Sequence, residues 1–125
     1  MSNPELTKTF VAESAIAANR IVKFGSTDDY VVQGAAATDS LIGVVELVAP
    51  ASGERCDVVL DDIAEVKLGG SVTRGGPITS DASGQGVAAA PATGVNNRVI
   101  GYALASGSSG DIIPMLIEQG SMQGA

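Results

Sequence analysis

The chain has 125 residues, which is room for one domain and not for two. Its net charge is −7 and its seven basic residues are scattered, so direct binding to nucleic acid or to an anionic membrane is not expected. Histidine is absent and Cys56 is the only cysteine, which removes the commonest general base, the commonest metal ligand and any disulfide framework. We therefore expect a protein that is not an enzyme, holds no cofactor or metal, and works by binding other protein surfaces.

The turn and core residues predict the fold class. Sixteen glycines and five prolines imply many tight turns, and with two Phe, two Tyr and no Trp the core must consist of Val, Ile, Leu and Ala. This composition predicts an all-β fold: a compact β-barrel or sandwich of about eight short strands, with an extended N-terminal arm and at most one short helix.

The N-terminal part begins with polar residues 1–8, interrupted by Pro4, which predict an extended arm. A first strand is expected over residues 9–12. Residues 13–19 form the only alanine-rich segment with helix potential, but a helix this short is marginal without packing. Residues 20–24 and 30–33 flank a turn-rich loop and together predict a hairpin.

The rest of the chain alternates short apolar runs with glycine-rich turns. In residues 55–60 and 63–68 apolar and charged side chains alternate, which is typical of half-buried strands. Further strands are expected over residues 41–48, 87–90, 98–104 and 111–118. A single β domain is thus predicted over residues 9–118, followed by a polar C-terminal tail over residues 119–125.

Three residues inside predicted strands carry information about the architecture. Gly43 and Gly101 interrupt good strand sequence, where glycine usually marks a bulge, a bend or the close approach of another backbone. Such positions favour a small, strongly curved barrel. Pro114 cannot donate a ladder hydrogen bond, which predicts that the last strand lies at an edge or a bulge, where a partner could bind.

No group of residues forms a convincing reaction site. The pairs Asp28–Asp29 and Asp61–Asp62 lie in predicted turns, where aspartate normally bonds its own backbone. The glycine-rich segment 69–76 lacks the Gly-Lys-Ser/Thr ending of a phosphate loop. Cys56 falls on the apolar face of its strand and behaves there as a small hydrophobe. Arg74, between two glycine pairs, is the most exposed basic residue and a candidate to bind a carboxylate on a partner.

An alternative function concerns Lys67. The strand and turn rhythm of residues 63–78 is similar to that of biotinyl and lipoyl carrier domains, in which the modified lysine lies at an exposed hairpin tip. Lys67 stands instead between Val66 and Leu68 within a predicted strand, so the modification signal is missing. A shared small β fold does not by itself imply a shared function.

The order and spacing of five segments carry a more extensive resemblance. The segments are LIGVVEL (41–47), GERCDVVL (53–60), IAEVKLGGSVTRGGPITSDASG (63–84), RVIGYAL (98–104) and GDIIPMLI (110–117). Over residues 10–118 the chain resembles the small capsid decoration, or cement, proteins of tailed bacteriophages. The resemblance implies a protein made in the bacterial host cytoplasm that binds the outer surface of an assembled phage head. It implies a homotrimer that stabilises contacts between major capsid subunits, with no catalytic residues.

The candidate contacts with the capsid or with other subunits follow from this resemblance and from the predicted arm and edge strand. They are Asn3, Pro4, Glu5, Leu6, Thr7, Lys8, Arg74 and Pro114. We expect the arm, residues 3–8, to become ordered only on the capsid. Another phage structural or binding module, such as a tail or adhesin domain, is the main alternative.

Overall fold

The computed structural model describes residues 7–46 and 48–124. Within these residues the chain forms β-strands and no helix, so the expectation of an all-β fold is confirmed. The strands are β1 (Thr7–Ala12), β2 (Arg20–Phe24), β3 (Tyr30–Gln33), β4 (Leu41–Val45), β5 (Arg55–Val59), β6 (Asp62–Lys67), β7 (Pro77–Ser80), β8 (Gly86–Ala88), β9 (Asn96–Ala103) and β10 (Ile112–Gln123).

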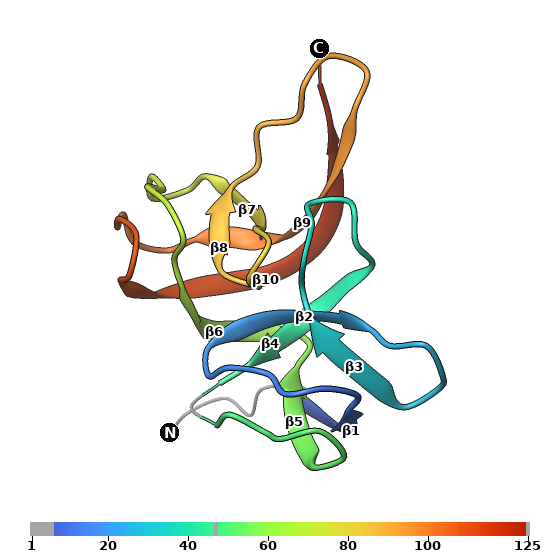
Figure 1. Cartoon of the computed structure of the whole chain (residues 1–125). Coiled ribbons are helices and arrows are strands. Elements are labelled where there is room, and N and C mark those ends of the chain that lie inside the picture. The colour runs from blue at the N-terminus through green and yellow to red at the C-terminus, as the bar shows by residue number, and fades with distance from the viewer. Residues whose placement is uncertain (1–6, 47, 125) are drawn as a thin grey trace.

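The first five strands close into a small barrel in the order β1-β3-β2-β4-β5 (Figure 1). The predicted hairpin is present, with Phe24 of β2 opposite Val31 of β3. Strand β1 closes the barrel because it pairs with β5 in antiparallel fashion on one side and with β3 in parallel fashion on the other.

The other five strands form a second sheet in the order β6-β10-β9-β7-β8. All the strand pairs of this sheet are antiparallel. Strand β10 is long and strongly curved, and its last residues rise with the start of β9 as a ribbon that projects beyond the rest of the sheet (Figure 1). A register shift between Ile117 and Gly120 marks where the ribbon begins.

Two clusters of buried side chains build the core. One fills the barrel and includes Phe10, Val22 and Val58. The other lies between the barrel and the second sheet, and it combines Ile21 and Val44 of the barrel with residues of the second sheet such as Met115. Strand β4 is buried along its whole length because one face lines the barrel and the other meets the second sheet.

Backbone approach explains the two glycines inside strands. A Cβ atom on Gly43 would collide with the carbonyl oxygen of Val59, and one on Gly101 would collide with that of Leu116. Both positions therefore fit the expectation that another backbone comes close. Gly43 belongs to β4 of the barrel, and Gly101 belongs to β9 of the second sheet.

Asn19 joins the two parts of the molecule. It has a left-handed backbone, with φ 59°, a conformation that asparagine tolerates better than most residues. Its side-chain amide donates a hydrogen bond to the carbonyl of Glu65 at 3.1 Å, and its own carbonyl accepts one from the backbone N–H of Lys67 at 3.0 Å. The chain entering β2 of the barrel is thereby attached to β6 of the second sheet.

Local details differ from the sequence-based expectations. Residues 13–19 form a loop, because the backbone N–H of Ile16 bonds to the carbonyl of Pro50 at 3.0 Å and its side chain is buried in the barrel core. Strand β7 was not expected. Strand β1 begins at Thr7, inside the range predicted as an arm, and β10 continues to Gln123, inside the range predicted as a tail. Both ends of the described chain are thus paired further than expected.

Candidate interaction surfaces

The described residues give no candidate metal site. They contain no group of three or more His, Cys, Asp or Glu side chains placed to hold a metal ion. Nor do they include a helix that is long and apolar enough to cross a membrane. Asp29 and Asp62 have positive φ angles of 67° and 72°, which is typical of aspartates in turns. The surface features of interest are a groove, the separate candidate contacts and an apolar sheet face.

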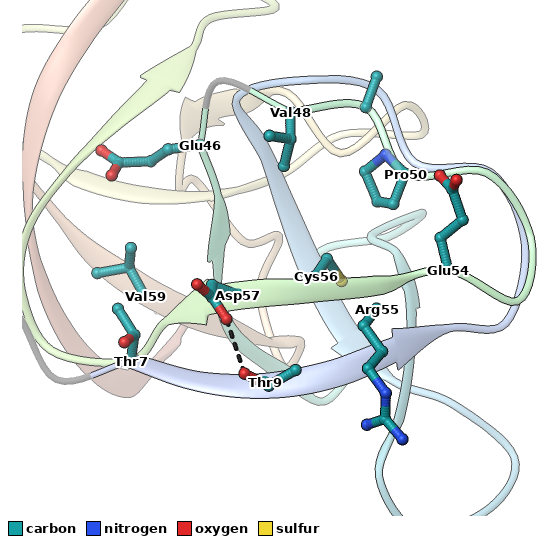
Figure 2. A pocket seen from close by; sticks show the side chains of 11 residues that line it. Thr7, Thr9, Glu46, Val48, Pro50, Glu54, Arg55, Cys56, Asp57 and Val59 are labelled. Carbon is teal, nitrogen blue, oxygen red and sulfur yellow. Dashed lines mark hydrogen bonds between the residues drawn. The ribbon is translucent and has the colours of Figure 1, made fainter.

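The groove lies over β1 and β5 and has a volume of about 840 Å³ (Figure 2). Its charged side chains are mostly acidic: Glu46, Glu54 and Asp57 stand against Arg55. Asp57 accepts a hydrogen bond from the Thr9 hydroxyl at 2.7 Å, as Figure 2 shows. This bond links β5 to β1, two neighbouring strands whose pairing closes the barrel, so it stabilises that closure.

Cys56 lies at the floor of this groove but is buried, with 5% of its surface exposed. Burial, with a smaller contribution from the negative charge of Asp57, raises the pKa of its thiol. Since the thiolate is the reactive form, the position is unsuited to nucleophilic chemistry, as the sequence predicts.

Thr7 and Lys8, the candidate contacts at the described end of the predicted arm, belong to the barrel. They lie opposite Val59 and Val58 in the β1–β5 ladder. The Lys8 ammonium group lies 3.0 Å from Asp29 Oδ1 and 4.5 Å from the centre of the Phe10 ring. Asn3, Pro4, Glu5 and Leu6 lie outside the described residues.

Pro114 lies in the interior of the second sheet, so the expectation of an edge strand is wrong: β10 runs between β6 and β9. The register shift of β10 lies further along the chain, so Pro114 is not at that bulge. Its carbonyl accepts a hydrogen bond from the N–H of Leu104 at 3.1 Å. Leu104 follows the last residue of β9, so Pro114 lies where the pairing of β10 with β9 ends. A proline, which has no N–H to donate, is tolerated at such a position.

Arg74 is exposed in the turn before β7. Its backbone N–H donates to the Ser106 hydroxyl at 2.9 Å, and the next residue, Gly75, donates to the carbonyl of Ala103 at 2.7 Å. These bonds hold Arg74 beside the end of β9, where Pro114 also bonds. The structure thus brings Arg74 and Pro114 to the second sheet and leaves Thr7 and Lys8 on the barrel.

Lys67 closes β6 and lies opposite Ile112 of β10 in the ladder. This is a position within a sheet and not a hairpin tip, so the geometry of a carrier lysine is not found there.

The outer face of the second sheet carries an apolar surface that the sequence-based reasoning missed. Four of its side chains are exposed: Ile63 at 44%, Tyr102 at 38%, Leu104 at 41% and Ile112 at 51%. The half-buried Pro114 and Leu116 lie between them. We call these six residues the outer apolar face. One feature of the sequence could have indicated this surface. Ile63 lies on the same side of its strand as Glu65 and Lys67, so an apolar side chain occupies a face that was expected to be polar.

Comparison with known proteins places this fold among phage structural proteins. A family model described as a phage cement protein matches residues 2–116 of the chain. Among solved structures, the chain is similar to the N base of head fiber gp8.5 in bacteriophage phi29, with a TM-score of 0.68 and 20% sequence identity, over 92% of this chain and 95% of that chain. No curated protein matches the chain. At this identity the structural likeness shows a shared fold.

Proposed function

Because the chain belongs to the phage cement protein family, we propose that it decorates the outer surface of an assembled phage head. In this proposal it binds the major capsid protein as a homotrimer and stabilises the contacts between neighbouring capsid subunits. It acts as a structural protein of the virion and not as an enzyme, it contacts neither nucleic acid nor membrane, and it is made in the cytoplasm of the bacterial host.

The observation that carries this proposal is the family match over residues 2–116. The fold supports it, since the similar solved structure is described as the base of a phage head fiber. The net charge of −7 agrees with an outward position, because the packaged DNA would repel such a protein. A trimer also suits a shell of repeated subunits: after one contact forms the others become intramolecular, so weak individual contacts suffice.

The proposed capsid contacts are residues 3–8 and Arg74. Of these residues, Thr7 and Lys8 are paired with β5 in the barrel. Arg74 is exposed in a turn whose backbone is fixed by two hydrogen bonds, and a guanidinium held in this way suits a carboxylate on the shell. Pro114 belongs to the outer apolar face.

The test is cosedimentation of the purified protein with emptied, expanded heads of its source phage over a salt series. We expect saturable binding at a fixed ratio to the major capsid protein. A loss of binding as salt rises would indicate that charged contacts such as Arg74 dominate, because salt screens exposed charges. Absence of binding to these heads would contradict decoration and favour a tail or adhesin module.

Two variants separate the proposed contacts from the fold. Deletion of residues 1–6 leaves β1 complete, since β1 begins at Thr7, and should reduce occupancy of the heads without lowering the melting temperature. Arg74→Ala should also reduce occupancy, whereas Arg55→Ala, which removes an exposed arginine from the groove over β5, serves as its matched control. Unchanged occupancy after both the deletion and Arg74→Ala would remove these residues from the interface.

A further inference from the structure

The outer apolar face runs without interruption across the second sheet. Leu116 of β10 lies directly opposite Ile63 of β6 on one side and Tyr102 of β9 on the other. Pro77 of β7 lies opposite Tyr102 and continues this row. A second row places Pro114 beside Leu104, so the two rows form one continuous apolar surface on a single face of the sheet.

This face is not needed to complete the core of one chain. The opposite face of the same strands already packs against the barrel, through buried residues such as Val66, Met115 and Ile117. The outer face instead leaves large side chains in water, with Ile112 the most exposed of them. A contiguous exposed apolar patch of this kind, on a rigid sheet, typically marks an interaction site.

Charged side chains are arranged unevenly around this face. Glu118 follows Ile117 at the bulge of β10, and Asp61 precedes Asp62, which lies opposite Ile117, so both acids lie at the end of the face nearest this bulge. At the other end Lys67 lies opposite Ile112, and Arg74 lies beside the end of β9.

Two further acids belong to this arrangement. Glu65 lies on the edge strand β6, opposite Pro114, and Asp111 at the basic end accepts a hydrogen bond from the Ser108 N–H at 3.0 Å. The face therefore has an acidic end, and at its opposite end Lys67 is the basic residue of the sheet.

We infer that a second copy of this chain covers the outer apolar face. The inference rests on the proposed function in taking these copies to be subunits of the proposed trimer. The same face of a second chain provides apolar side chains that cover the two rows. It also provides complementary charges, because its acidic end can meet the basic end of the first chain. Around a threefold axis each copy gives one end of the face to each neighbour. Elsewhere two chains of net charge −7 repel one another, so this face is where association is least opposed.

The first experiment measures the mass of the free, full-length protein by light scattering over a range of concentrations. We expect three times the chain mass of 12.4 kDa. In the variant Ile112→Lys a buried unpaired charge would oppose the contact, so the apparent dissociation constant should rise by about tenfold or more. Because the side chain is exposed in the single chain, the fold should be retained, which circular dichroism checks.

Phe24→Lys is the matched control, since Phe24 is a similarly exposed apolar side chain, at 57%, but lies on β2 of the barrel. Its mass should equal that of the original protein. The inference is overturned if the unmodified protein stays monomeric at every concentration, or if Ile112→Lys associates as strongly as Phe24→Lys.

A charge exchange tests the arrangement of the two ends independently. Lys67→Glu alone should weaken association, and the double variant Lys67→Glu with Glu118→Lys should restore it, because the complementary ends are then exchanged. No restoration in the double variant would contradict the proposed pairing of ends. These measurements use no capsid, so a trimer that fails to bind heads contradicts the proposed function alone, and a monomer that binds heads contradicts this inference alone.

Discussion

At the scale of single residues, Gly101 illustrates how one absent side chain permits a strand pair. A Cβ atom at this position would overlap the carbonyl oxygen of Leu116 in the neighbouring strand, and a backbone atom cannot move aside as a flexible side chain can. We expect Gly101→Ala to lower the free energy of unfolding by about 1–3 kcal/mol, the usual cost of overpacking. Urea denaturation followed by circular dichroism measures this change.

Gly120 provides the control for this prediction. It lies in β10, and an added Cβ would meet no heavy atom within 4 Å. Gly120→Ala should therefore leave the free energy of unfolding unchanged or raise it slightly, because alanine restricts the unfolded chain more than glycine does. Equal losses in the two variants would show that strand propensity, and not the close approach at Gly101, is the cause.

Glu13 introduces a pH dependence into the loop between β2 and β3. Its carboxylate accepts hydrogen bonds from the Ser26 backbone N–H and from the Ser26 hydroxyl, both at 2.8 Å. These bonds, the backbone bond first, hold the pKa of Glu13 below its ordinary value. The unfolded chain then takes up the proton more readily, so the stabilisation is present above the ordinary glutamate range, near about pH 4.3, and is lost as pH falls through the lowered pKa.

The corresponding test compares melting temperatures from neutral pH down to about pH 3. In Glu13→Gln the part of the acid-induced decrease that comes from this carboxylate should disappear. Ser26→Ala removes the hydroxyl donor and keeps the backbone donor, so its pH profile should lie between the other two. Profiles that coincide for all three proteins would assign the acid sensitivity to other carboxylates.

At the scale of secondary structure, the ribbon formed by residues 96–99 and 120–123 is held differently from the rest of its sheet. Beyond the bulge, β9 and β10 pair only with each other, whereas residues 112–117 of β10 also pair with β6. Two contacts attach the ribbon to the barrel: the Arg98 N–H donates to the Ala37 carbonyl at 2.7 Å, and the Gln119 side-chain amide donates to the Ile42 carbonyl. A two-stranded ribbon is only marginally stable in water.

We therefore expect amide hydrogen exchange to be faster in residues 120–123 than in residues 115–117, as measured by mass spectrometry. Gln119→Ala should accelerate exchange in the ribbon further and leave residues 115–117 unchanged. Ser121→Ala, an exposed substitution in the same ribbon, should have no such effect. Uniform protection along the whole of β10 would contradict the weaker attachment of the ribbon.

The strands themselves show what the sequence could and could not predict. Most strand positions were predictable because alternation and glycine turns are local signals, as in β5 and β6. Strand β7 was missed because it begins at Pro77, directly after two glycines, and continues with Thr79 and Ser80, polar residues that are nevertheless buried. The pairing of β1 with β3 and of β6 with β10 depends on contacts between distant segments, which a local pattern does not contain.

The same limit applies to the candidate surfaces. Arg74 was predictable as an exposed residue because glycine pairs flank it. Its position near the end of β9 was not, since it depends on the hydrogen bonds from the turn to Ala103 and Ser106. The outer apolar face remained unrecognised because its members come from β6, β10, β9 and the residue after β9, and become neighbours only through the register of these strands.

At the scale of the whole molecule, the barrel and the second sheet share one core. Ile21 and Val44 belong to barrel strands yet pack in the cluster that contains Ile100 and Met115 of the second sheet. Asn19 adds hydrogen bonds between the two parts. Neither part buries its apolar surface alone, so we expect the described chain to unfold in a single cooperative transition.

The two tyrosines allow this expectation to be tested, because Tyr30 lies in β3 of the barrel, Tyr102 lies in β9 of the second sheet, and the chain has no tryptophan. In Tyr30→Phe the remaining tyrosine fluorescence reports on the second sheet, and in Tyr102→Phe it reports on the barrel. We expect each fluorescence transition in urea to coincide with that variant's own transition by circular dichroism. Adding Ile21→Ala should lower both transitions together, by about 2–5 kcal/mol, because this barrel side chain supports the shared core. A loss confined to the barrel signal would mean that the second sheet folds independently, and the shared cluster would then be a contact between two units and not a common core.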